Sequence, residues 1–219
     1  MKRPFRTTAV FAASVAAAAI VAGTAIAHPH VTRRIRIPLE HGEFQVQYFT
    51  VPYNASHLDK IPEGYLWHLG FASIDVGDGV TTGGATVPAG KYHLFARLGD
   101  GKKAWSLVIV PQGKGRDIAV LGFQTFNEKD AEKQKGMVAK LNEMAEGKIV
   151  LPTEFRREKS DSEHLSMTVE DRGVNLGEAR QGNTGDVKSL GHDFVLHVDF
   201  GELHGSVTFD DKGATAVEK

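Results

Sequence analysis

Histidine is the residue type in this chain with the widest choice of chemistry, because its imidazole binds metal ions and transfers protons near neutral pH. The 219-residue sequence contains ten histidines and no cysteine. A metal site here must therefore use imidazole nitrogen rather than thiolate ligands, which suits copper or zinc. Four histidines have a spacing or a position that favours metal binding: His28, His192, His197 and His204.

His197 and His204 lie in two consecutive segments, DFVLHVDF and LHGSVTF, whose alternating apolar residues predict a pair of strands. If Phe200 and Gly201 form a two-residue turn, the two histidines lie directly opposite each other. Their Cβ atoms are then about 5 Å apart, close enough for both imidazoles to reach one metal ion. A turn shifted by one residue pairs His204 with Asp199 instead, and both histidines are then ordinary solvent-face residues.

His28 follows a segment with the three parts of a secretory signal peptide. Residues 1–27 comprise a basic start, an uncharged apolar run and the small-x-small pattern Ala25-Ile26-Ala27. Cleavage after this pattern makes His28 the first residue of the mature chain, whereas an uncleaved leader would be a membrane anchor.

A histidine in the first position can chelate Cu(II) through its terminal amine and Nδ1, and another histidine of the fold completes the nitrogen ligands. The other terminal chelate needs deprotonated amides at positions two and three, and it is blocked because Pro29 has no N–H. The first mode requires a fold histidine beside the terminus, and His197 with His204 is the predicted partner. A frayed polar terminus without metal is the alternative.

The composition bounds the class of protein. Removing the 27-residue leader from 219 residues leaves 192, the size of a single domain at 28–219 with a hydrophobic core. The leader contains three of the 26 basic residues, so 23 remain against 27 acidic ones, which argues against nucleic acid as a partner. We expect a periplasmic or secreted protein without disulfide bonds and without a membrane span after cleavage.

The sequence carries no motif of the common enzyme classes. It has no Gly-x-Ser-x-Gly nucleophile motif and no Walker spacing for a phosphate-binding loop. We therefore assign no catalytic residues, and copper or zinc is the one cofactor class that the residues suggest.

Alternating apolar and polar residues recur through most of the chain and predict short strands between turns rich in Gly, Pro and Asp. This pattern favours an all-β fold, an antiparallel β-sandwich with a jelly-roll-like arrangement. Apolar residues at three-to-four spacing predict one inserted amphipathic helix near 128–146, with Asn127 as its N-cap. The glycine-rich segment near 171–192 has little periodicity, and we interpret it as either a functional flap or a disordered loop.

The segment ATVPAGKYHLFARLGDGKKAWSLVIV carries a hairpin motif. Its residues, with two from the preceding segment YLWHLGFASIDV, are Trp67, Gly70, Pro88, Ala89, Gly90, Tyr92, Leu94, Phe95 and Trp105. The proline sets φ before the turn, the following glycine admits a backbone angle closed to other residues, and Tyr92 and Leu94 then enter the core. On these residues the chain resembles, over about Ile35 to Phe209, the bacterial exported β-protein family called domain of unknown function 2911. The resemblance implies export and a β-fold, and it implies no activity.

These observations predict an exported, non-enzymatic binding or accessory protein for an unassigned small ligand, glycan or protein. We expect its site on a sheet face or beneath the loop around Lys188. The alternatives are a copper or zinc protein that uses the four histidines, and a carbohydrate-active enzyme, a function that β-sandwich folds often support.

Overall fold

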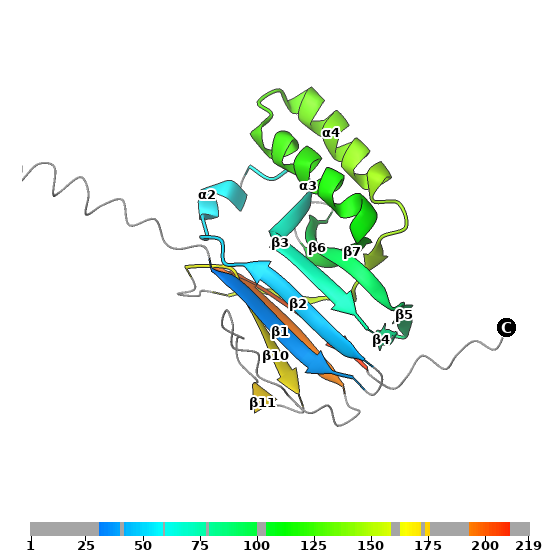
Figure 1. Cartoon of the computed structure of the whole chain (residues 1–219). Helices are drawn as coiled ribbons and strands as arrows, with labels where there is room; N and C mark the ends of the chain where they lie inside the picture. The colour runs from blue at the N-terminus through cyan, green and yellow to red at the C-terminus, as the bar shows by residue number, and fades with distance from the viewer. Residues whose placement is uncertain are drawn as a thin grey trace, which may run out of the picture.

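Two antiparallel sheets and a pair of helices make up most of the described part of the chain (Figure 1). The computed structural model describes residues 31–39, 42–58, 60–77, 79–99, 104–158, 163–171, 174–175 and 193–210. The predicted signal peptide, His28 and His192 lie outside the described residues, as does most of the glycine-rich loop. No helix within the described ranges is long and apolar enough to cross a membrane.

Within the described residues the first sheet has six strands and the second has five, and neighbouring strands run antiparallel. In spatial order the first sheet contains β1 (Thr32–Pro38), β2 (Glu43–Phe49), β3 (Leu66–Val76), β6 (Gly90–Leu98), β7 (Trp105–Pro111) and β8 (Ile149–Val150). The second contains β11 (Val174–Asn175), β10 (Ser166–Asp171), β12 (Phe194–Phe200), β13 (Leu203–Phe209) and β9 (Glu154–Arg157). A separate ladder joins β4 (Val80–Thr82) to β5 (Ala85–Val87). The prediction of a mostly antiparallel β-protein is confirmed.

Alternation in the sequence becomes alternation in burial along the strands. In β12, Phe194, Leu196, Val198 and Phe200 are buried, and the residues between them are partly exposed. A strand directs successive side chains to opposite faces, so this pattern places one side of the sheet against the core. β1 and β2 form a hairpin, and so do β12 and β13, the two strands predicted to pair around His197 and His204.

The buried sides of the two sheets face each other across one hydrophobic core. The ring of Phe44 in the first sheet lies 5.0 Å from the rings of both Phe194 and Phe209 in the second. A polar contact also joins the sheets, because the hydroxyl of Tyr48 accepts a 2.9 Å hydrogen bond from the backbone N–H of Met167. Fully burying a side chain of this size contributes about 1.5–3 kcal/mol, so these contacts between the sheets stabilise the fold.

Two helices cover part of the outward face of the first sheet, where one helix was predicted. α3 (Gln112–Asn127) contacts β3, β6 and β7, and α4 (Ala131–Met144) packs beside α3 (Figure 1). A further short helix, α2 (Ala55–Leu58), precedes β3. α4 occupies the predicted helical segment, but its N-cap is Asp130 rather than Asn127, which is the last residue of α3.

The prediction of a single inserted helix is wrong because α3 forms through packing rather than through intrinsic propensity. Its sequence QGKGRDIAVLGFQTFN contains three glycines, each of which weakens a helix by about 1 kcal/mol relative to alanine. Two of them, Gly115 and Gly122, are buried against the sheet together with Ile118. The hydroxyl of Tyr65 also donates a 2.9 Å hydrogen bond to the carbonyl of Gly122. The small residues let the helix lie close to the strands.

The hairpin motif has a structural role. Tyr92 and Leu94 are buried, as predicted, and the tyrosine hydroxyl donates a 2.8 Å hydrogen bond to the carbonyl of Pro88. Gly90 has a φ of 156°, an angle that residues with a side chain rarely adopt, and this is where the predicted need for glycine arises. These contacts fasten the start of β6 and contain no reactive group.

Candidate functional site

The predicted pairing of His197 with His204 is wrong, because the turn between β12 and β13 lies one residue further along the chain. His204 pairs with Asp199, and His197 pairs with Ser206. Gly201 has a φ of 59°, a left-handed angle that favours glycine, and it begins the turn. The alternative register of the sequence analysis is therefore the one that forms.

Both of these histidines lie on the outward side of the second sheet, and each is held by a carboxylate. The Nδ1 atom of His204 donates a 2.7 Å hydrogen bond to Asp199, and the Nε2 atom of His197 donates a 3.0 Å hydrogen bond to Glu170. Within the described ranges, no group of three or more His, Cys, Asp or Glu side chains is arranged to hold a metal ion. His28 and His192, the other two predicted ligands, lie outside those ranges.

The structure brings together a different pair of histidines, His68 on β3 and His93 on β6. The Nε2 atom of His68 lies 3.1 Å from the Nδ1 atom of His93, and the ring centroids are 5.0 Å apart. Neither residue was a predicted ligand. The alternation along its strand places His93 on the side away from the core-facing residues, and this only weakly indicates a functional role. Nothing in the sequence around His68 indicates that it contacts His93.

A bulge in β3 creates this pair. His68 pairs with Phe95 and Ser73 pairs with His93, so four residues of β3 lie opposite the single residue between the paired positions on β6. Bulges of this kind redirect side chains and recur beside functional sites. Without the bulge, a regular register would place Gly70 rather than Ser73 opposite His93.

The bulge contains two residues in the left-handed region of backbone space. Gly70 has a φ of 51°, and a Cβ atom there would overlap the carbonyl of Phe49 and the side chain of Leu165. Phe71 has a φ of 53° and is the one non-glycine residue with positive φ in the described part of the chain. Such a conformation costs on the order of 1–2 kcal/mol and persists where the surroundings enforce it, often at functional sites.

Aromatic rings and the first turn of α3 surround the histidine pair. The ring of His68 lies 4.7 Å from that of Phe95 and 5.4 Å from that of Phe71, which is 67% exposed. A Cβ atom on Gly115 of α3 would overlap the Cδ2 atom of His93, so this helix touches the edge of that imidazole. The pair therefore lies at a junction of β3, β6 and α3.

This environment keeps both imidazoles uncharged. Burial, with a smaller contribution from the neighbouring His93, lowers the pKa of His68 to about 4, and the Ala72 backbone partly opposes the shift. Burial also lowers the pKa of His93. Neutral imidazole is the form that ligates metal ions. The hydrogen that the two facing nitrogens share must first move to the far nitrogen of its own ring, after which both can bind one ion without net loss of a proton.

The Nδ1 atom of His68 is buried and makes no hydrogen bond of standard geometry, although the Ala72 backbone interacts with the ring and favours its protonated form. A buried polar atom in this state costs about 1–3 kcal/mol.

The spacing of the pair fits two ligands of one metal ion. Two nitrogens 3.1 Å apart, each about 2.0–2.1 Å from an ion, subtend about 100° at that ion. This angle lies between the 90° of square-planar copper and the roughly 109° of tetrahedral zinc. The described residues supply two protein ligands, so water or another group must occupy the remaining positions.

A polar surface extends from His93 across the part of the first sheet that the helices leave uncovered (Figure 1). Register pairs link His93 to Ser73, Ser73 to Gln47 and Gln47 to Arg34 in one row across β6, β3, β2 and β1. Phe49 lies two positions along β2 from Gln47, and its exposed ring is 6.2 Å from the exposed ring of Phe71. The outward face of the sheet therefore combines hydrogen-bonding side chains with aromatic surface.

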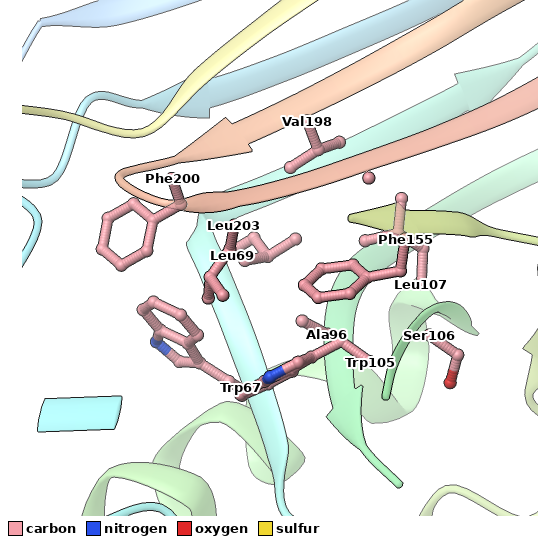
Figure 2. Close-up of a pocket in the computed structure, with 11 residues that line it drawn as sticks. Trp67, Leu69, Ala96, Trp105, Ser106, Leu107, Phe155, Val198, Phe200 and Leu203 are labelled. Carbon is pink, nitrogen blue, oxygen red and sulfur yellow. The ribbon is translucent and has the colours of Figure 1, made fainter. Parts of the chain in front are cut away.

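An apolar cavity lies elsewhere, between the two sheets. Figure 2 shows it beside Trp67, whose ring lies 6.1 Å from that of Trp105 and 4.7 Å from that of Phe200. Its volume is about 30 Å³. A cavity that binds benzene in another protein is about 150 Å³, so this space is too small for an organic ligand. It is a gap in the packing at the end of the core.

No protein-family model, curated protein or solved structure matches the chain. The resemblance to the exported family stays a prediction from the hairpin motif.

Proposed function

We propose that this chain is an exported binding protein that holds a copper or zinc ion with His68 and His93. The observation that carries the proposal is the 3.1 Å separation of two ring nitrogens that burial keeps uncharged. The exported location rests on the predicted signal peptide. The proposal keeps the predicted class of binding protein and the predicted metals, and it moves the site from the second sheet to the first.

The alternative histidines are less suited to the role. His197 and His204 each already donate a hydrogen bond to a carboxylate, at 3.0 Å and 2.7 Å. Their positions on β12 and β13 are also not directly opposed, whereas His68 and His93 bring two ring nitrogens to within 3.1 Å of each other. Carboxylate-bound histidines of this kind are common on solvated sheet faces as well as in metal sites.

Copper is the preferred metal of the two. Divalent copper binds nitrogen ligands more tightly than zinc does, in accord with the general affinity order of the first-row metals. Zinc sites with two histidines usually add thiolate or carboxylate ligands, and no such third side chain joins the pair within the described residues.

Metal titration of the mature protein tests the proposal. The protein is freed of metal by a chelator and titrated with Cu(II) and with Zn(II), and binding is followed by calorimetry and by electron paramagnetic resonance. We expect one equivalent of bound copper that is lost in His68→Gln and in His93→Gln. His197→Gln and His204→Gln are the matched controls, and they should bind as the unchanged protein does. Loss of binding in these controls alone, or no binding at all, contradicts the proposal.

A glycan is the second candidate ligand, favoured by the exposure of Phe71 beside the polar row. Sugars bind where planar hydrogen-bonding groups lie next to exposed rings. Electrophoresis through gels that contain polysaccharides would show retardation that Phe71→Ala removes. Equal mobility of the variant and the unchanged protein in every polysaccharide would exclude this surface.

The proposal extends to the arrangement of the two sheets. The buried contacts of Phe44 with Phe194 and Phe209 support an antiparallel β-sandwich with a jelly-roll-like arrangement. We assign the chain no catalytic residue.

A further inference from the structure

We propose that β1, the outer strand of the first sheet, is a docking edge for an extended acidic segment of another protein. The partner would add as a further strand beside β1, and its carboxylates would face the arginines of that strand. This surface lies apart from the proposed metal site, because β2 and β3 separate Arg34 from His93 in the row across the sheet. The inference therefore goes beyond the proposed function and requires no metal.

β1 is the longest of the four strands that border the two sheets in the described part of the chain (Figure 1). It has seven residues, whereas β8 and β11 have two each and β9 has four. Its register with β2 runs without a shift, so no bulge bends it away from a partner. Edge strands are usually shortened or bulged, because their outward backbone groups pair with other chains. β1 has neither feature.

The register shows which backbone groups of β1 face away from β2. The carbonyl of Val31 accepts a 3.0 Å hydrogen bond from the N–H of Thr50, and the N–H of Leu39 donates a 3.1 Å hydrogen bond to the carbonyl of Gly42. In an antiparallel pair, alternate residues bond to the neighbouring strand, and the residues between them direct N–H and C=O the other way. Four residues of β1 therefore direct their backbone at the outer edge: Thr32, Arg34, Arg36 and Pro38. Proline has no N–H, so this edge offers three donors and four acceptors.

β1 is already held in the extended form that a strand partner needs. Ile35 and Ile37 are each 5% exposed, and they attach the strand to the core between the sheets. The alternate side chains, which include Arg34 and Arg36, lie on the outward side. A partner does not have to order this strand, and ordering is one of the main costs of association.

The charge of this edge selects the partner. Arg33, Arg34 and Arg36 give β1 three positive charges, and β2 contributes one carboxylate, that of Glu43. Glu43 forms an ion pair with Arg36 at 2.7 Å, whereas the guanidinium of Arg34 donates a 2.8 Å hydrogen bond to the uncharged amide of Gln47. Opposite charges on facing residues of two strands attract each other. A strand with acidic residues at alternate positions therefore suits Arg34 and Arg36.

A second copy of this chain is a poorer partner. Within the bounds of β1, two copies of the strand can pair antiparallel with all three N–H groups in use in two registers. One register sets the two copies of Arg34 opposite each other, and the other sets Arg34 opposite Arg36. Like charges directly opposite each other destabilise a strand pair. The arginines therefore disfavour self-association and favour an acidic strand.

Synthetic peptides test the inference on the purified protein with a chelator present. The probe is a fluorescent peptide with blocked ends, Thr-Glu-Val-Glu-Val-Glu-Thr, and binding is measured by fluorescence anisotropy at low salt. We expect saturable binding, about tenfold tighter than that of the same peptide with glutamine in place of glutamate, because two glutamates face arginines. Methyl groups on the glutamate nitrogens should abolish binding, because these N–H groups face β1. Methyl groups on the valine nitrogens, which point away, should not change it.

Variants of the protein locate the binding surface. Arg34→Gln combined with Arg36→Gln should remove the preference for the glutamate peptide, and Lys91→Gln, an exposed charge on β6 of the same sheet, should leave it unchanged. Thr32→Pro should weaken binding, because it removes an outward N–H and leaves the bonds to β2 in place. The methylated peptides make the same test on the unchanged protein, so the result does not depend on whether this variant folds.

Four outcomes would overturn the inference. No saturable binding of the glutamate peptide excludes the docking edge, and equal binding of the glutamate and glutamine peptides excludes an acidic partner. Equal binding of the two methylated peptides excludes strand addition, because only attraction between charges then remains. Sedimentation of the protein alone as a dimer that Thr32→Pro converts to a monomer assigns the edge to a second copy of the chain.

Discussion

Replacing His68 with glutamine should make the stability of the metal-free protein less sensitive to acid. Burial lowers the pKa of His68 to about 4 in the folded chain, and an unfolded histidine has a pKa of about 6.5. Below about pH 6.5 the unfolded chain binds a proton that the folded chain does not. The free energy of unfolding therefore falls as the pH drops from about 6.5 toward 4, and the contribution is constant below that range.

The size of this effect follows from the two pKa values. At about pH 5 the unfolded histidine is almost fully protonated and the folded one is almost fully neutral, which lowers the free energy of unfolding by about 2 kcal/mol relative to pH 7.5. Glutamine does not titrate in this range, and its side-chain amide still offers a hydrogen bond to the Nδ1 atom of His93. The variant should therefore lose about 2 kcal/mol less than the unchanged protein between the two pH values.

Urea unfolding with a chelator present measures the effect. The unchanged protein and His68→Gln are each unfolded at about pH 7.5 and at about pH 5. For each protein the loss in free energy of unfolding between the two pH values is calculated, and the gap between the two losses is the contribution of His68. His57→Gln, on the exposed surface of α2, is the matched control, and its difference should stay within about 0.5 kcal/mol. Equal acid sensitivity of His68→Gln and the unchanged protein would refute the reasoning, because it would mean that the folded imidazole is not held neutral.

Two further substitutions test how α3 and the core are packed. Gly115→Ala should destabilise the protein by about 1–3 kcal/mol, because the added methyl group overlaps His93, whereas Gly136→Ala has open space and should stabilise α4 by about 0.5–1 kcal/mol. Thermal unfolding of both variants checks this pair, and equal shifts would show that α3 does not press on the imidazole. Tyr48→Phe should lower the free energy of unfolding by about 1–3 kcal/mol, because it leaves the buried N–H of Met167 without its partner. A urea midpoint unchanged from that of the original protein would show that water replaces the hydroxyl.

The strands could be predicted because their signal is local. In β2 and β12 each core residue is two positions from the next, and a strand needs only this alternation to bury one side. The segment of α4 was predictable for the same reason, since spaced apolar residues such as Val138 and Leu141 mark its buried side. The assignment of its cap was wrong by three residues, because Asn127 ends one helix and Asp130 begins the next.

α3 could not be predicted from local propensity. Its buried positions include Gly115 and Gly122, which disfavour a helix in isolation and permit close contact with a sheet. The register of β12 and β13 also depended on a single residue. A turn that begins at Gly201 rather than at Phe200 pairs His204 with Asp199 and separates it from His197.

The sequence by itself determined the export prediction, the absence of thiolate ligands, the alternating strands and the block that Pro29 places on a terminal amide chelate. Tertiary structure alone decided which histidines meet. His68 and His93 are 25 positions apart in the sequence, and their contact requires a bulge whose Gly70 packs against Phe49 of β2 and against Leu165, the residue before β10. A short-range pattern records which side of a strand a residue occupies, but the contact between two strands depends on where their register breaks, and that is set by packing from distant parts of the chain.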